Sequence, residues 1–259
     1  MAALALISTR PALAGTQPAA TAAPASPTDH PSPLGPLGSP EKIISAGETV
    51  ALFALISLAP AALLMVTAFV RISIVLTLLR QALGSPQVPG NQVITALALL
   101  LTAIVMKPVA EEVYVKGIEP YRLHRASAEE AWTASTQPIK KFMINQIYLT
   151  NHQHYLRVLY DHAEPPSPGR IEPTQVEELP LRIVAPAFLL SELTTALMIG
   201  FAIYLPFLVI DLVVSAVLSA MGLYMLPPSL VAMPMKLIVF VLADGWILVP
   251  EMLLRSFGY

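Results

Sequence analysis

Apolar residues gather in two long blocks, residues 45–106 and 183–259, with a polar stretch between them. Both blocks contain uncharged runs of about 20 residues, the length at which a helix crosses the hydrocarbon core of a bilayer. The stretch in between, residues 107–182, holds 9 of the 15 Lys and Arg residues and 10 of the 17 Asp and Glu residues. The pattern therefore predicts two membrane-embedded blocks joined by one water-facing insert.

The first block is expected to form a helical hairpin. Residues 50–70 carry no charge and are long enough to span a bilayer. The apolar sequence resumes after Arg71 and ends at Arg80, and residues 81–91 contain two glycines and two prolines that predict a turn. The apolar run 93–106 then returns, so the hairpin has its arginines near the tip.

The second block predicts another hairpin. Glu192 and Asp211 bracket 18 uncharged residues, and Pro206 is expected to kink the helix between them. Prolines then predict a non-helical hinge at residues 226–234, and Asp244 interrupts the last apolar run.

The insert and the amino terminus carry different signals. Residues 111–130 and 140–161 are predicted to be surface helices.

Residues 1–14 end in Ala-Leu-Ala and resemble part of a cleavable signal peptide, with a disordered Ala-rich tail as the alternative. Residues 15–44 are rich in proline and alanine, which predicts an extended linker. The positive-inside rule places the turn after Arg80 in the cytoplasm, and the amino terminus and insert in the periplasm.

Composition supports a membrane protein. Hydrophobic residues make up 55% of the 259 residues and charged residues only 12%, whereas soluble domains are about a quarter charged. The chain is therefore expected to be an all-α integral membrane protein of helical hairpins, with about four hydrophobic segments, a polar helical insert and membrane lipids around it. The net charge of −2 argues against a nucleic-acid partner, and the lack of cysteine excludes disulfides and thiolate chemistry.

Three stretches carry a family resemblance. Phe69 to Gly84 reads FVRISIVLTLLRQALG, Ser191 to Pro228 begins SELTTALMIG and contains FLVIDLVV, and Met235 to Val249 reads MKLIVFVLADGWILV. Together they resemble the FliP family of flagellar type III export proteins, over residues 45–121 and 180–257. Injectisome counterparts share this signature, and the amino-terminal extension favours the flagellar branch.

The resemblance implies a channel subunit and not an enzyme. Members form a pentameric ring with FliQ-like and FliR-like subunits, next to other export-apparatus membrane proteins. The complex conducts unfolded flagellar proteins across the bacterial inner membrane, as part of the flagellar basal body. No cofactor is implied.

The resemblance also implies a pore gate. In the family a methionine-rich loop in the second block closes the pore like a gasket, and here this loop has two methionines. Its candidate residues are Met221, Gly222, Leu223, Tyr224, Met225, Pro227 and Pro228. Methionine can pack against itself and yet yield to varied side chains, although the residues alone also fit ordinary packing in a helix-breaking turn.

Five charged residues lie within or beside the apolar segments: Arg71, Glu192, Asp211, Lys236 and Asp244. Ionisable groups in such segments are costly, so they are expected to form ion pairs that set hairpin assembly. The alternative is that they mark segment ends and reach to water.

Other function classes have weaker support. A small-solute secondary transporter with broken helices fits the prolines, but the two blocks show no visible internal repeat. Asp211 and Asp244 could form the carboxylate pair of an intramembrane protease, although neither lies in a glycine-preceded aspartate motif. His152, His154, Asp161 and His162 could suggest zinc, but residues i and i+2 of a helix do not share a face. Solvated loop histidines are the preferred interpretation, and no metal is expected.

Overall fold

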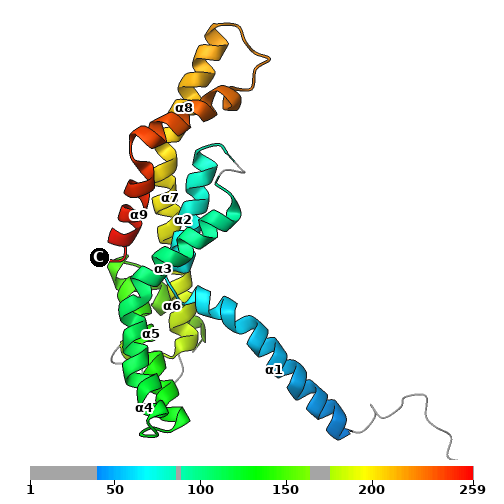
Figure 1. Cartoon of the computed structure of the whole chain (residues 1–259), viewed down its shortest axis with the longest axis vertical. Helices are drawn as coiled ribbons and strands as arrows, with labels where there is room; N and C mark the ends of the chain where they lie inside the picture. The colour runs from blue at the N-terminus through cyan, green and yellow to red at the C-terminus, as the bar shows by residue number, and fades with distance from the viewer. Residues whose placement is uncertain (1–39, 86–88, 164–175, 259) are drawn as a thin grey trace, which may run out of the picture. The chain divides into compact units, whose positions relative to one another are not determined.

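The computed structural model describes residues 40–85, 89–163 and 176–258, and within these ranges all regular secondary structure is helical, with no strand (Figure 1). This confirms the all-α prediction. The predicted signal peptide, the linker up to residue 39 and part of the insert lie outside the described residues. The elements are α1 (Pro40–Met65), α2 (Phe69–Ala82), α3 (Asn91–Val113), the π-helical turn η2 (Tyr114–Ile118), α4 (Glu119–Arg122), α5 (Ala128–Leu149), α6 (Gln153–Ala163), the 3₁₀ turn η3 (Val176–Glu178), α7 (Leu181–Ala220), α8 (Pro228–Leu242) and α9 (Gly245–Arg255).

The chain divides into two units, residues 1–53 and 54–259. The second unit contains α2 to α9 and all the candidate site residues. The fold and the sites described below belong to this unit.

The predicted helix over residues 50–70 is wrong at its carboxyl end, because α1 stops at Met65. The hydroxyl of Thr67 donates a 2.9 Å hydrogen bond to the carbonyl of Leu64 and accepts one from the amide of Phe69. A side chain that bonds the backbone in this way competes with helix continuation. The resulting turn starts α2 afresh and places Arg71 in its first turn.

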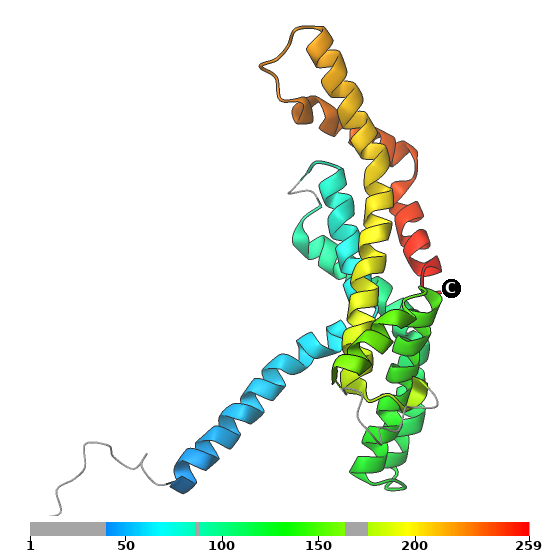
Figure 2. The ribbon, with the colours of Figure 1, turned by 180° about the vertical axis from the view of Figure 1, so that it is seen from behind.

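Helix α7 is the central element of the unit. Its 40 residues span about 60 Å, and Figure 2 shows it running as one long helix with α2 beside it. The helix passes without a break through Glu192, Pro206 and Asp211. The alternative that these charges mark segment ends is therefore wrong for this helix: Glu192 is buried against Arg71, and Asp211, which is partly exposed, is paired with Lys236.

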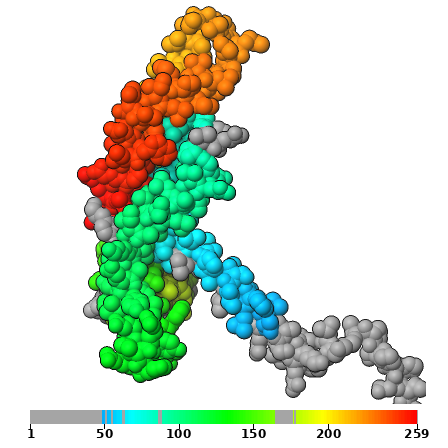
Figure 3. Space-filling view, viewed as in Figure 1, coloured from blue at the N-terminus to red at the C-terminus, as the bar shows by residue number. Residues whose placement is uncertain are grey.

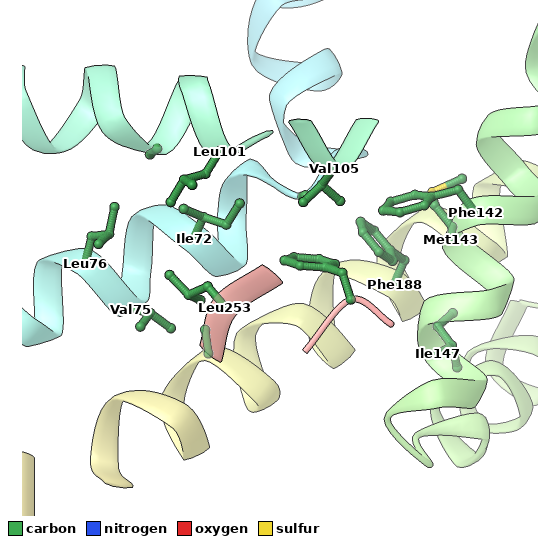
Figure 4. Close-up of a cluster of buried hydrophobic side chains, with 14 of the residues drawn as sticks. Ile72, Val75, Leu76, Leu101, Val105, Phe142, Met143, Ile147, Phe188 and Leu253 are labelled. Carbon is green, nitrogen blue, oxygen red and sulfur yellow. The ribbon is translucent and has the colours of Figure 1, made fainter. Parts of the chain in front are cut away.

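The core lies between α2, α7 and the helices that cover them. Figure 4 shows Ile72 and Leu76 of α2 pointing toward Leu101 of α3, with Val75 on the opposite side of α2 and Leu253 of α9 nearby. Farther along α7, Phe188 packs edge-on against Phe142 of α5, with ring centroids 5.9 Å apart. On the face seen in Figure 3, α9 lies next to α3, which closes this core.

The insert is built on the end of α3, which continues to Val113 and through the π-helical turn η2 into α4. The predicted helix 111–130 is thus wrong as a single helix: it ends near Arg122, and α5 begins with a capping box between Ser127 and Glu130. The predicted helix 140–161 is also broken, at Asn151. This residue adopts φ 59°, and its amide bonds the carbonyl of Tyr148, as in a Schellman ending.

The second hairpin turns earlier than predicted. Helix α7 ends at Ala220, and Gly222 at φ 71° closes it with the paired Schellman bonds from Gly222 to Ser219 and from Leu223 to Leu218. The hinge predicted at residues 226–234 is wrong beyond residue 227, because Pro228 starts α8 and Pro234 lies inside it. Proline is well tolerated in the first turn of a helix, where its missing amide has no partner to lose.

Among the described residues, two helical stretches are long and apolar enough to cross a membrane, residues 91–122 and α7. Helices α8 and α9 together make a third candidate, bent by 67° at Asp244. With the apolar part of α1, these segments agree with the predicted membrane protein of helical hairpins.

We expect Gly200→Val to destabilise the fold, because α2 and α7 approach closely at this residue. A β-carbon on Gly200 would lie 2.1 Å from Cδ1 of Leu78 and 3.1 Å from its Cβ. Overpacking of this kind costs about 1–3 kcal/mol, so the thermal unfolding temperature in detergent should fall. Ala216→Val at an exposed position of the same helix is the control. Equal unfolding temperatures for the two variants would contradict the close approach.

Candidate functional site

A buried arginine joins three helices and the carboxyl-terminal turn. Arg71 is fully buried, and its Nε and Nη2 donate to the two carboxylate oxygens of Glu192 at 2.8 and 2.5 Å. Its Nη1 donates to the carbonyl oxygen and to the hydroxyl of Ser256, and Nη2 also donates to Oε1 of Gln146. The guanidinium lies 4.0 Å from the ring centroid of Phe257. We call Arg71, Gln146, Glu192, Ser256 and Phe257 the arginine cluster.

The arginine cluster is saturated with hydrogen bonds. Each guanidinium nitrogen has at least one acceptor, and Gln146, held by Arg71 through its oxygen, donates its amide to the carbonyl of Phe257. The bidentate geometry suits arginine and not lysine, because the planar fork matches a carboxylate. A buried ion pair is costly to desolvate, so this one depends on the full set of partners. The cluster ties α2, α5 and α7 to the end of the chain.

A second polar network lies one residue away. Ser191 is fully buried, and its hydroxyl lies 2.8 Å from Oγ1 of Thr150 and 2.9 Å from Nδ1 of His152. Tyr155 extends the network to Thr194 on α7. The prediction of solvated loop histidines is therefore wrong for His152, which is buried because the Schellman turn after α5 points it at α7.

Burial lowers the pKa of His152, with a further lowering from His154 and from Arg71. In the part of the chain that the structure describes, no three His, Cys, Asp or Glu side chains converge as metal ligands. The histidine network is better described as a polar joint between the insert and α7.

The remaining intramembrane charges separate into a pair and an exposed residue. Lys236 of α8 is buried and lies 2.6 Å from Oδ2 of Asp211 on α7, so this ion pair joins the two arms of the second hairpin. Asp244 is exposed and adopts a left-handed backbone at the break between α8 and α9. An intramembrane protease would need Asp211 and Asp244 to share a proton, but Asp211 is instead paired with Lys236.

The two arginines predicted near the tip of the first hairpin lie in different places. Arg80 is at the tip, where its guanidinium bonds the side chain of Asn91 across the turn. Arg71 lies at the opposite end of α2, in the arginine cluster. The tip prediction is therefore wrong for Arg71.

The candidate gate loop, residues 221–227, joins α7 to α8 at one end of the unit, as the orange loop in Figure 1 shows. Its side chains point into open space: Met225 is 96% exposed and Tyr224 80%, and Met221 is also largely exposed. The interpretation of this loop as ordinary packing in a turn is disfavoured, since these side chains contact little of their own chain.

Comparison with known proteins identifies the family. The model of the FliP family matches residues 52–253. This chain belongs to the FliP family. It is 44% identical over 220 residues to the flagellar biosynthetic protein FliP of Caulobacter vibrioides, an alignment covering 85% of this chain and 78% of that protein. It is 39% identical over 218 residues to the protein of the same name from Bacillus subtilis, covering 84% and 95%.

Sequence reasoning missed most partners in these clusters. Arg71 and Glu192 were singled out as charges within apolar segments, but Gln146, Ser256 and Phe257 carry no local signal that distinguishes them from surface residues. The one usable signal was Thr-Asn-His at residues 150–152, since asparagine is common at the left-handed position that ends a helix.

We expect Glu192→Gln to destabilise this FliP protein strongly. The substitution keeps the shape of the side chain but leaves the Arg71 cation buried without a counter-charge, which costs about 3–5 kcal/mol. The double variant Arg71→Met/Glu192→Leu should be more stable than Glu192→Gln alone, because it removes both charges. Unfolding in detergent, followed by circular dichroism, measures both. If the double variant is less stable than Glu192→Gln, the cluster is not dominated by charge burial.

His152 should make stability depend on pH. Because the pKa of His152 in the folded protein is below the ordinary 6.5, the unfolded chain binds the proton more tightly. The contribution of neutral His152 to the free energy of unfolding is therefore fully present above about pH 7 and is lost as the pH drops through the folded pKa. His152→Gln should flatten the slope between about pH 7.5 and 5. His162→Gln, at an exposed residue, should keep it. A wild-type slope in the His152 variant would contradict the assignment.

Proposed function

We propose that this chain is a core channel subunit of the flagellar type III protein export gate in the bacterial inner membrane. The observation that carries the proposal is the FliP family match over residues 52–253, together with relatives named flagellar biosynthetic protein FliP that align with most of the chain. Apolar helices long enough to cross a membrane agree with this location. In this role the chain is a component of the export apparatus that conducts unfolded flagellar proteins, and it needs no cofactor.

The exposed apolar surface supports assembly with partners. Helix α7 is about 60 Å long, twice the hydrocarbon thickness of a bilayer, so part of it must be covered by protein or reach beyond the membrane. Its uncovered side chains continue along its whole length, and they include Leu197, Phe201, Leu205, Val209, Leu212 and Val217. A pentameric ring with FliQ-like and FliR-like subunits would bury such a surface.

The gate loop supports a role in closing the pore. Several copies arranged around an axis would bring their loops together, so that Met221, Met225 and Tyr224 close against one another. Methionine suits this task because it is flexible and polarizable and can repack around varied substrates. The amino terminus and the charged insert then lie in the periplasm, with the Arg80 turn in the cytoplasm.

Two alternative functions would have different consequences. An injectisome export-gate subunit would share the same gate chemistry, but the relatives aligned above carry flagellar names. A small-solute secondary transporter would work as a monomer or dimer without FliQ-like and FliR-like partners.

The composition of the purified complex tests the proposal. A tagged chain is expressed with its candidate partners, extracted in mild detergent, and weighed by native mass spectrometry. We expect several copies of this chain together with two other small apolar proteins. A lone monomer or dimer from the same cells would overturn the export-gate assignment and favour the transporter.

Shortening both methionines of the gate loop to glycine should make the assembled pore leak. Met221→Gly/Met225→Gly removes the exposed apolar bulk that would close the ring, so cells should become sensitive to ions that the closed gate excludes. Met221→Leu/Met225→Leu keeps the bulk and serves as the control. Growth at raised salt measures the leak. Unchanged sensitivity in the glycine variant, at normal complex yield, would contradict a gasket role.

A further inference from the structure

The charged residues of the apolar segments pair with one another, except for one cation and one anion. In residues 54–106 and 183–258 the cations are Arg71, Arg80, Lys236 and Arg255, and the anions are Glu192, Asp211, Asp244 and Glu251. Six of these side chains form the ion pairs Arg71–Glu192, Lys236–Asp211 and Arg255–Glu251. Within the described ranges, this leaves Arg80 and Asp244 as the two charges without an ionic partner.

Asp244 presents its carboxylate on an apolar surface, at the break between α8 and α9. The side chain is exposed, it does not cap α9, and no described residue donates a hydrogen bond to it. Leu242 and Ile247 beside it are exposed as well. Lipid or protein that covers this surface removes water from the carboxylate, and an ionised group without water needs a counter-charge. The left-handed backbone does not account for the carboxylate, because glycine adopts that conformation more readily.

Arg80 has the opposite deficit. Its Nη1 donates to the side-chain oxygen of Asn91, which belongs to a neutral amide. Its Nε is buried, and among the described residues no acceptor lies within hydrogen-bond distance of it. A guanidinium stays charged in proteins, so Arg80 has both an uncompensated positive charge and an unused donor.

The two unpaired charges lie at about the same level of α7. Leu79, next to Arg80, lines one apolar groove along α7 together with Ala243 and Gly245, which flank Asp244. In both Figure 1 and Figure 2, the first hairpin (α2 and α3) and the α8–α9 break lie to either side of α7.

This placement suits a head-to-tail contact between copies, in which opposite sides of one subunit meet and close a ring. Copies in a closed ring are related by a rotation, so residues that meet across the contact lie at the same height along the ring axis. Helix α7 is a candidate membrane span and would run along that axis, so charges at one level of α7 can meet between neighbours.

We propose that Arg80 of one copy pairs with Asp244 of the next copy around the ring. The partner of this surface is therefore a second copy of this chain, and the inference rests on the ring proposed above. Each contact then removes the last uncompensated cation and anion of the described apolar segments. Complementary charges also fix the register of an interface, so the pair sets the level at which neighbouring copies meet.

Crosslinking between single-cysteine chains tests the contact, and it has no background because the chain contains no cysteine. Two differently tagged full-length chains, one with Arg80→Cys and one with Asp244→Cys, are expressed together with the candidate partners. Membranes are treated with a short bismaleimide, one tag is captured and the other is detected. We expect a crosslinked dimer that carries both tags. Glu251→Cys in place of Asp244→Cys, about 10 Å farther along α9, is the matched control and should give little dimer.

Charge exchange tests the energetics of the same contact. Arg80→Glu and Asp244→Arg should each lower the yield of the complex of several copies by about tenfold, because each places like charges opposite one another. The double variant Arg80→Glu/Asp244→Arg should restore most of the yield. Glu251→Arg reverses a carboxylate whose partner is in its own chain, so it should leave the yield unchanged.

Several results would overturn the pair. A crosslink that forms only when one chain carries both cysteines would place the contact within a single copy. A crosslink from the Asp244→Cys chain to a different protein would assign the cation to that protein. Normal complexes with neither crosslink nor rescue would refute the pair alone, whereas a wild-type chain that forms no complex of several copies would refute the ring together with the pair.

Discussion

Arg71 places a full positive charge where water is excluded. The surrounding helices are arranged so that they supply this charge with a counter-charge and hydrogen-bond acceptors. Glu192 supplies the counter-charge from α7, Gln146 an acceptor from α5, and Ser256 two acceptors from the end of the chain. A guanidinium deprived of any of these would stay charged and under-solvated. The cluster therefore specifies one packing of α2, α5, α7 and the carboxyl terminus and disfavours shifted ones.

Neutralised charge also explains the length of α7. A carboxylate normally marks the place where an apolar helix reaches water, but Glu192 and Asp211 each have a cation beside them. The helix can therefore run on through both positions for 40 residues. One continuous helix then connects the insert, through the Ser191 and His152 network, to the candidate gate loop at its other end.

The apolar surface of the unit has two different characters. Along α7 it consists of exposed apolar side chains that no other part of the described chain covers, which suits contact with other subunits. At the α8–α9 break it is concave, because Asp244 bends the backbone and Gly245 lets Phe240 lie against it.

The sequence by itself determined the class of protein, the two apolar blocks and the positions of the charges within them, because length, periodicity and charge are local properties. The tertiary structure decided where helices end and which charges meet. Thr67 stops α1 through its own backbone bonds, and Glu192 fails to stop α7 only because Arg71, 121 positions away in the chain, neutralises it. Gln146, His152 and Phe257 acquired their roles in the same way, since a polar side chain is tolerated in the core only when distant partners satisfy it.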